Sequence, residues 1–101
     1  MADVTVVYWR DIPAQVIVGK GRRGTKRPLP ERFEQAIDRV AMKTGAAGTD
    51  EYLAEWRKAD PYVVEGSDVE VADKEAARLD TEYDQARLKA LIDTNGWAEA
   101  P

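Results

Sequence analysis

The stretch that decides the fold is residues 4–18, VTVVYWRDIPAQVIV. Its two halves, residues 4–10 and 14–18, are rich in β-branched and aromatic side chains and are apolar on both alternating faces, which favours strands. The connector between them, Asp11-Ile12-Pro13, contains a proline that fixes φ and an aspartate that can bond to its own turn. The stretch therefore predicts a β-hairpin.

The pattern changes to a helical period after residue 30. Apolar residues recur at spacings of three and four, while charged residues occupy the opposite face, as in an amphipathic helix. Pro30 suits the first helical position, and Lys43 and Gly45 suit the end of a helix. The apolar stripe comprises Phe33, Ala36, Ile37, Val40 and Ala41.

A short second helix is predicted after the link of small residues at positions 45–48. Thr49 is suited to be its N-cap, Trp56 lies on its apolar stripe, and it should end before Asp60-Pro61. Residues 62–65, YVVE, then indicate a brief third strand.

From Asp68 onward the chain is dominated by residues that favour helices. The pattern fits one long helix, or two with a break near Asp80-Thr81. Asn95-Gly96 is a natural stop. Beyond it we expect Trp97 to fold back or to be exposed, and residues 98–101 to form a frayed tail.

The predicted order of elements is β-β-α-α-β-α. It indicates a single α+β domain over residues 1–97, in which helices pack on a mostly antiparallel, three-stranded sheet. The sequence leaves the place of the third strand in the sheet open, although an inner position beside the first strand would explain why residues 4–9 are apolar on both faces.

Composition excludes several classes of chemistry. The chain of 101 residues contains no cysteine and no histidine, which removes disulfides, thiolate nucleophiles, imidazole bases and the usual zinc and haem ligands. Ser67 is the only serine and has no histidine to activate it. The acids after residue 67 alternate with bases, as on a solvated helix surface. We therefore expect no cofactor, no metal and no catalysis by this chain alone.

The start of the chain lacks the pattern of a signal peptide, and no apolar run approaches the roughly 20 residues that span a bilayer. A cytoplasmic location is the expectation.

Residues 16–30, VIVGKGRRGTKRPLP, contain the spacing G-x-G-x-x-G after a strand. A dinucleotide fingerprint needs a helix to begin at those glycines, but Pro28 and Pro30 disfavour helix at the residues before them. A phosphate-binding P-loop requires Lys before Thr, whereas Thr25 precedes Lys26 here. Neither nucleotide site is predicted.

Five cations within eight residues are the most informative surface feature. Residues 1–43 carry a net charge of +4 and residues 44–101 a net charge of −8. The cations could contact an anionic partner, or they could be attracted to the acidic second half of the chain itself. We call them the basic segment: Lys20, Arg22, Arg23, Lys26 and Arg27.

Arg10 and the three tryptophans complete the candidate residues. Arg10, at the predicted turn, could orient a ligand or pair with Asp11. Trp9 and Trp56 are predicted to pack in the core, and Trp97 is the tryptophan best placed to anchor a partner.

Three segments resemble a known family. The residues WRDIPAQVIVGKGR (9–22), ERFEQAIDRVAMKTG (31–45) and TDEYLAEW (49–56) together resemble the small bacterial domains called virulence factor domains, related to a terminal part of the conserved virulence factor C proteins. The resemblance spans residues 3–92.

The resemblance to this family implies a bacterial cytosolic domain with an accessory or assembly role. Similar domains accompany HEAT-type helical repeats and a segment like an iron–sulfur scaffold in larger proteins, or occur alone near genes for corrinoid and folate methyl transfer. The resemblance transfers no catalytic residue, and without Cys or His this chain could not itself hold an iron–sulfur cluster.

The leading hypothesis is thus a non-catalytic protein-interaction module that uses the basic segment, with Arg10 and Trp97 as further contacts. The alternatives are anion or nucleic-acid binding by the same segment, and an accessory subunit that completes a partner enzyme. Nucleic acid is disfavoured because the acidic second half would repel it.

Overall fold

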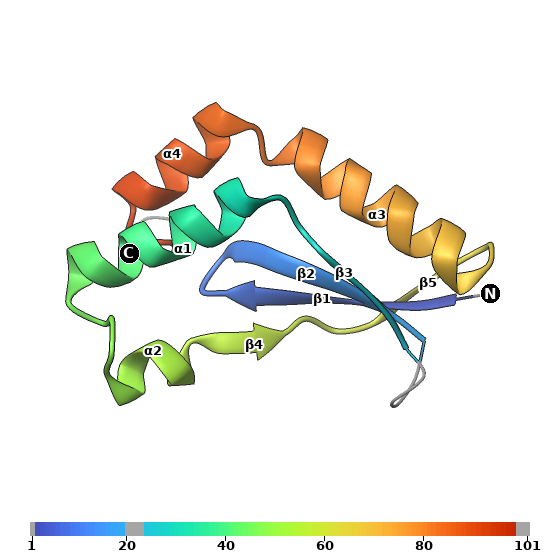
Figure 1. The fold of residues 1–101 in the computed structure, drawn as a ribbon, viewed down its shortest axis with the longest axis horizontal. Coiled ribbons are helices and arrows are strands. Elements are labelled where there is room, and N and C mark those ends of the chain that lie inside the picture. The colour runs from blue at the N-terminus through green and yellow to red at the C-terminus, as the bar shows by residue number, and fades with distance from the viewer. Residues whose placement is uncertain (1, 20–23, 99–101) are drawn as a thin grey trace.

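The computed structural model describes residues 2–19 and 24–98. Within these ranges the chain forms one five-stranded sheet and four helices (Figure 1). The strands are β1 (Ala2–Trp9), β2 (Ile12–Val18), β3 (Thr25–Pro28), β4 (Trp56–Lys58) and β5 (Tyr62–Val64). The helices are α1 (Glu31–Thr44), α2 (Asp50–Ala54), α3 (Asp68–Glu82) and α4 (Gln85–Asp93).

The predicted hairpin is confirmed, with a tighter turn than expected. β1 and β2 pair antiparallel from Val4 opposite Val18 to Trp9 opposite Ile12, with an irregularity beside Tyr8. The turn therefore consists of Arg10 and Asp11 alone, while Ile12 and Pro13 belong to β2.

The sheet order is β3-β2-β1-β4, and β5 also pairs with β1. Every pairing is antiparallel. β1 is thus an inner strand with a neighbour on each edge, and the strand at residues 62–64 lies beside it.

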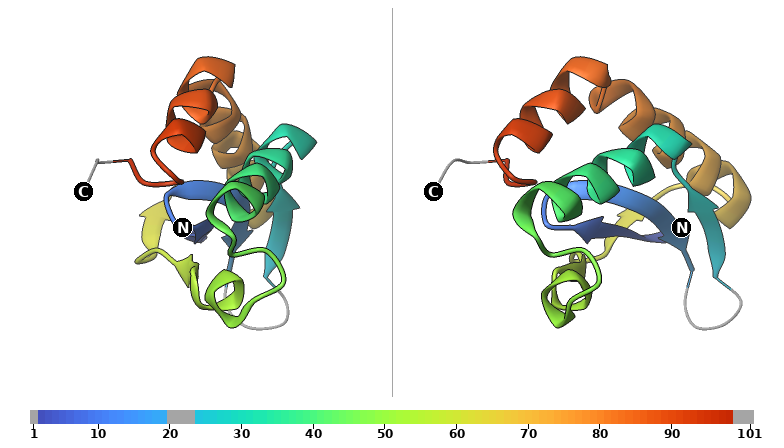
Figure 2. Two further views of the ribbon diagram at one scale, coloured as in Figure 1. Left: turned by 90° about the vertical axis from the view of Figure 1, so that its left-hand side faces the viewer. Right: turned by 60° about the vertical axis from the view of Figure 1, so that its left-hand side comes forward.

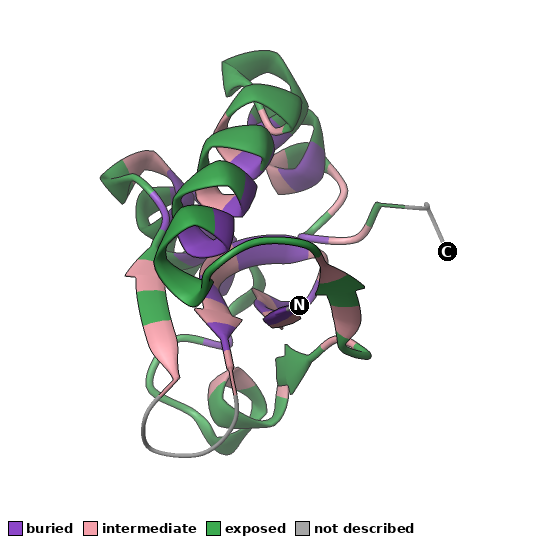
Figure 3. Cartoon of the chain, turned by 90° about the vertical axis from the view of Figure 1, so that its right-hand side faces the viewer, coloured by how far each residue is buried: buried purple, intermediate pink, exposed green. Residues whose placement is uncertain are grey.

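Three helices, α1, α3 and α4, cover one face of the sheet, and α2 lies on the opposite side at one end (Figures 1 and 2). Alternate residues of β1 and β2 point toward the three helices, and the buried positions concentrate in that interface (Figure 3). Burying such side chains contributes about 1.5–3 kcal/mol each. The fully buried residues there include Val4, Val16, Val18, Phe33, Ile37, Val40 and Val71.

The predicted α+β class and element order are confirmed, and two short strands add to the three that were predicted. β3, TKRP, resembles a charged loop in sequence because it is an edge strand, where lysine, arginine and proline are tolerated.

The second helix ends before Asp60-Pro61 as predicted, but the predicted place of Trp56 on its apolar stripe is wrong. α2 stops at Ala54, and Trp56 pairs with Trp9 across the sheet as part of β4. A five-residue helix has little stability of its own, so pairing with the free edge of β1 decides the conformation of residues 56–58. Trp56 is consequently 37% exposed and does not lie in the core, whereas Trp9 is fully buried as predicted.

The C-terminal region forms two helices with the break at Tyr83-Asp84, slightly later than expected. The carboxylate of Asp84 caps α4 by accepting a hydrogen bond from the backbone N–H of Arg87 at 2.9 Å. The predicted stop at Asn95-Gly96 is confirmed, since both residues adopt positive φ. None of the helices in the described ranges is long and apolar enough to cross a membrane.

Candidate functional site

The structure separates the members of the basic segment. Lys20, Arg22 and Arg23 lie outside the described residues. Lys26 and Arg27 are neighbours in β3 and therefore point to opposite faces of the sheet. Lys26 pairs with Ile17 and Arg27 with Val16 in the antiparallel register.

Arg27 faces the acidic helix α3. Its Nε donates a hydrogen bond to Oδ1 of Asp73 at 2.8 Å. Asp68, at the start of the same helix, lies beside Gly19, where an added Cβ would come within 2.9 Å of its Oδ2. Acidic residues of α3 thus lie beside Gly19, which precedes the basic segment, and bind Arg27, one of its cations.

Lys26 lies on the other face of the sheet, which only α2 covers among the described helices, and only at one end (Figure 2). The register places Thr5, Ile17 and Lys26 in one row across this face, and Lys58, Val7 and Gln15 in the next. We call this surface the helix-free face: Asp3, Thr5, Val7, Gln15, Ile17, Lys26, Lys58 and Val63.

The helix-free face is partly apolar and carries two exposed lysines. Val63 is 54% exposed, Ile17 is half-buried, and Lys26 and Lys58 are exposed. Neither lysine forms an ion pair with a residue in the described part of the chain. Sequence reasoning missed Lys58 because residues 56–58 were assigned to a helix; the pairing with β1 brings it onto the face.

Arg10 and Trp97, the two remaining predicted contacts, come together at the opposite end of β2 from the basic segment. Arg10 is 5% exposed, and its guanidinium contacts the rings of both Trp9 and Trp97, at 4.9 and 5.4 Å from their centroids. Its Nη1 donates to the carbonyl oxygen of Asn95 at 2.7 Å.

Two carboxylates complete the surroundings of Arg10. Nη2 lies 3.6 Å from Oε1 of Glu51, and Nε lies 4.0 Å from Oε1 of Glu55. Arg10 is therefore an internal link between the hairpin turn, α2 and the C-terminal segment.

Asp11 does not pair with Arg10. Its Oδ1 accepts a hydrogen bond from Nη2 of Arg57 at 2.8 Å, and its Oδ2 accepts one from the backbone N–H of Ala98 at 2.7 Å. Arg57 also donates to the carbonyl oxygen of Arg10 at 3.0 Å. Ala98, the first residue of the predicted tail, is thus bound to the turn, and residues 99–101 lie outside the described residues.

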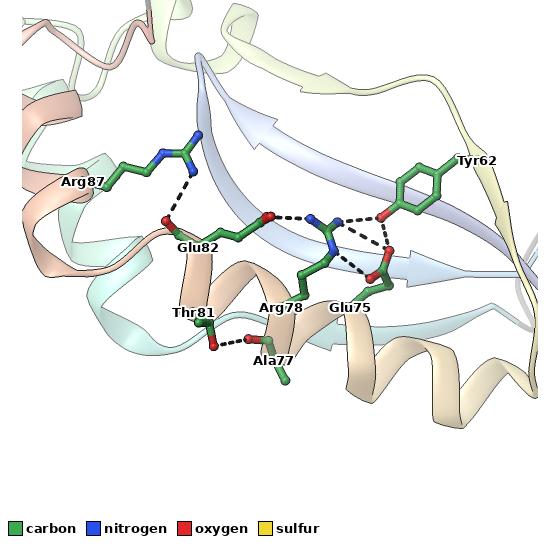
Figure 4. A network of polar contacts seen from close by, with 7 residues as sticks. All are labelled: Tyr62, Glu75, Ala77, Arg78, Thr81, Glu82 and Arg87. Atoms are coloured by element: carbon green, nitrogen blue, oxygen red, sulfur yellow. Dashed lines mark hydrogen bonds and ion pairs between the residues drawn. The ribbon is translucent and has the colours of Figure 1, made fainter.

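A polar network joins β5 to α3 (Figure 4). The hydroxyl of Tyr62 donates to Glu75, whose other oxygen accepts from Nε of Arg78 at 2.9 Å. Arg78 also pairs with Glu82 at 2.6 Å. The sequence predicts these acids to alternate with bases on a solvated surface, but it does not show that Glu75 is 8% exposed and bonded to Tyr62.

The pKa values of Tyr62 and Glu75 in this network are both shifted further from pH 7. Burial and the hydrogen bond to Glu75 raise the pKa of Tyr62 to about 12. Burial opposes ionisation of Glu75, but the hydrogen bonds from Arg78 and Tyr62 outweigh it and lower the pKa of that carboxyl. General acids and bases need pKa values near the working pH, so the network has the properties of a structural ion pair.

In a chain without cysteine and histidine, a metal site would have to rest on carboxylates. Within residues 2–19 and 24–98, no group of three or more acidic side chains is arranged to hold a metal ion.

Comparison with known proteins identifies the family. No curated protein and no solved structure matches the chain. The model of the family described as "Virulence factor" matches residues 7–92, most of the described sheet and helices. The chain therefore belongs to the virulence factor family.

Proposed function

We propose that this domain is a non-catalytic protein-interaction module that binds an anionic surface of a protein partner through the helix-free face and the adjoining basic segment. The observation that supports this most directly is that Lys26 and Lys58 are exposed on the same face, on either side of apolar residues of β1 and β2.

The arrangement matches the usual anatomy of an interface. β3 and β4 are the outer strands and β2 and β1 lie between them, so the two lysines are separated by three strand spacings, on the order of 15 Å. The half-buried Ile17 lies between them, together with Val7, of which only 9% is exposed. Protein interfaces commonly have such an apolar centre and a charged, hydrated rim.

The charge indicates the kind of partner. Lys26 and Lys58 face solvent, and Lys26 follows Lys20, Arg22 and Arg23 closely in sequence, whereas Arg27 is already bound to Asp73. Positive charge at the rim accelerates association with an acidic protein surface. A duplex would be a poorer partner because residues 44–101 carry a net charge of −8.

The test is co-purification of the tagged chain at its native abundance, with quantification of bound proteins. Lys26→Glu and Lys58→Glu should each reduce recovery of one defined partner by about fivefold or more. Lys74→Glu, an equivalent charge reversal on the exposed surface of α3, should leave recovery unchanged. Circular dichroism melts would verify that all three variants fold.

Recovery of the partner by a double variant, Arg22→Glu with Arg23→Glu, measures whether the rest of the basic segment contributes to binding. An identical partner profile for the wild type and the two β-strand variants would exclude the helix-free face. Retardation of RNA or DNA at low salt, lost on the same reversals, would replace the protein partner with nucleic acid.

A further inference from the structure

A groove runs along the helical side of the molecule, on the opposite side of the sheet from the helix-free face. It lies between α1 and α4 and has a volume of about 1190 Å³. The two helices begin together, where Arg32 donates to the carbonyl oxygen of Tyr83, and end together, where Nζ of Lys43 donates to the carbonyl oxygen of Ile92 at 3.1 Å. They therefore run parallel, as Figure 1 shows.

The groove has an apolar lining that includes an exposed methionine. Ala36 and Leu88 are buried at its base, and Ile92 is half-buried. Met42 is 75% exposed, the highest value among the exposed large apolar residues of the described chain. Methionine adapts its shape to a partner, and an apolar side chain in a concave surface is a common docking feature.

The charges that line the groove differ between its two ends. Asp80 and Asp84 lie at the end where α4 begins, and Asp80 is paired with Arg32. Arg39 and Lys89 lie nearer the other end and form no ion pair with a described residue. Asp38, beside Arg39, reduces this positive charge without cancelling it.

We propose that the groove binds an amphipathic helix of a protein partner, which runs antiparallel to α1 and α4. An apolar stripe would contact Met42 and Ile92. Acidic side chains in its first turn would lie near Arg39 and Lys89, and basic side chains in its last turn near Asp84. This is the charge distribution that most helices have, because it complements their own macrodipole.

The dimensions set the length of the bound segment. α4 has nine residues and α1 has 14, so at 1.5 Å per residue the groove is about 14–21 Å long. The contact would involve about three to four turns of the partner helix.

A second copy of this chain is a poorer occupant. The apolar stripes of its longer helices are already buried in its own core, as Phe33, Ile37, Val71 and Leu91 are each 5% exposed or less. An occupant of a concave apolar groove must instead bring a free apolar stripe.

The test uses two synthetic 14-residue peptides with the same leucine stripe and the same staple on the polar face, so that both are helical. One has Glu in the first turn and Lys in the last, and the other has these charges exchanged. Fluorescence anisotropy with the full chain should show the first peptide binding about fivefold more tightly at low salt. The difference should shrink as salt screens the charges.

Met42→Glu should weaken binding of both peptides by at least about fivefold. Leu53→Glu, which alters a 68% exposed apolar residue on α2, should have no effect. Lys26→Glu and Lys58→Glu should also have none, which separates this proposal from the one for the helix-free face.

Three results would overturn the proposal: no binding of either peptide, equal binding of both, or equal sensitivity to Met42→Glu and Leu53→Glu. Self-association of the chain in sedimentation equilibrium that Met42→Glu abolishes would also overturn it, because the groove would then be occupied by a second copy.

Discussion

The indole of Trp97 covers the guanidinium of Arg10, with 5.4 Å between the ring centroid and the guanidinium carbon. Trp9 lies against the same guanidinium at 4.9 Å, so the charge of a buried arginine is in contact with two aromatic rings. The residues come from the hairpin turn, its preceding strand and the segment after α4. This contact therefore fastens the C-terminal segment to the first hairpin.

Trp97→Ala should lower the free energy of unfolding by about 1–2 kcal/mol, because it removes a desolvated cation–π contact and the packing of the indole against Arg10. Urea unfolding followed by circular dichroism measures the change. Trp97→Phe keeps an aromatic ring and should recover part of the loss. Equal stability of the wild type and the alanine variant would mean that Trp97 does not hold Arg10 in solution.

Gly96→Ala should destabilise the domain more than Gly45→Ala. Both glycines have positive φ, so both substitutions strain the backbone by about 1 kcal/mol. At Gly96 an added Cβ would also come within 3.1 Å of Cδ of Arg10, whereas at Gly45 nothing lies within 4 Å. The difference between the two variants in urea unfolding isolates the contact with Arg10, and the prediction fails if they lose equal stability.

The sequence predicts well those elements whose own residues favour a strand or a helix. β1 and β2 are rich in β-branched and aromatic residues, α1 has a clear helical period, and Asn95-Gly96 stops α4 through backbone preferences alone. The strand conformation of β3 and β4 depends on pairing with neighbouring strands. For β4 that partner is distant in sequence, and the residues WRK at positions 56–58 do not themselves favour a strand.

The same distinction applies to the candidate sites. The concentration of cations at residues 20–27 is visible in the sequence, but the division of Lys26 and Arg27 between two faces depends on β3 being a strand. Burial of Arg10 depends on α2 and the C-terminal segment closing over the turn. The sequence does not contain those long-range contacts in any local pattern.

Acid should destabilise the wild type more than a Glu75→Gln variant. The folded pKa of Glu75 lies below its ordinary value because Arg78 and Tyr62, through their hydrogen bonds, outweigh the effect of burial. The stabilisation is complete above the ordinary pKa and is lost as the pH falls through the folded pKa, because the unfolded chain binds the proton first.

Urea unfolding from about pH 6 to about pH 3 covers the range in which carboxyl groups titrate. Over this range the free energy of unfolding should depend less steeply on pH for Glu75→Gln than for the wild type. Glu70→Gln removes an exposed carboxylate from the same helix and serves as the control. If both variants change the pH dependence equally, the effect belongs to net charge and not to the network.

Alkali should have the complementary effect through Tyr62. Its pKa is raised from 10.0 to about 12, so between these values the unfolded chain ionises while the folded chain keeps the proton. Stability that is present below pH 10 is then lost as the pH rises toward 12. Tyr62→Phe should reduce this loss in urea unfolding at alkaline pH.

Some alkaline loss should remain in Tyr62→Phe, since burial and the neighbouring Tyr83 also raise the pKa of Tyr8. The double variant with Tyr8→Phe should remove more of it. Alkaline curves for wild type and double variant that superimpose would contradict the assignment to these two hydroxyls.

Arg32 should prove the main support of the junction between α3 and α4. Arg32 lies on α1 and donates hydrogen bonds to the carbonyl oxygens of Asp80 and Tyr83. These carbonyl groups lie at the end of α3, where they have no partner within the helix. Arg32 also forms an ion pair with the carboxylate of Asp80. The guanidinium reaches these oxygens with two nitrogens in a fixed plane, a geometry that the single nitrogen of lysine does not reproduce. Arg32→Lys should therefore lose most of the stability that Arg32→Met loses, about 1–2 kcal/mol.

Hydrogen exchange should show where the loss occurs. Amides at residues 83–88 should exchange faster in Arg32→Met, while those of β1 should change only by the global loss of stability. Arg39→Met, an exposed arginine on the same helix without an ion pair to a described residue, is the matched control and should leave both regions unchanged. Uniform acceleration across the sheet and helices would instead show that Arg32 stabilises the whole domain and not the junction.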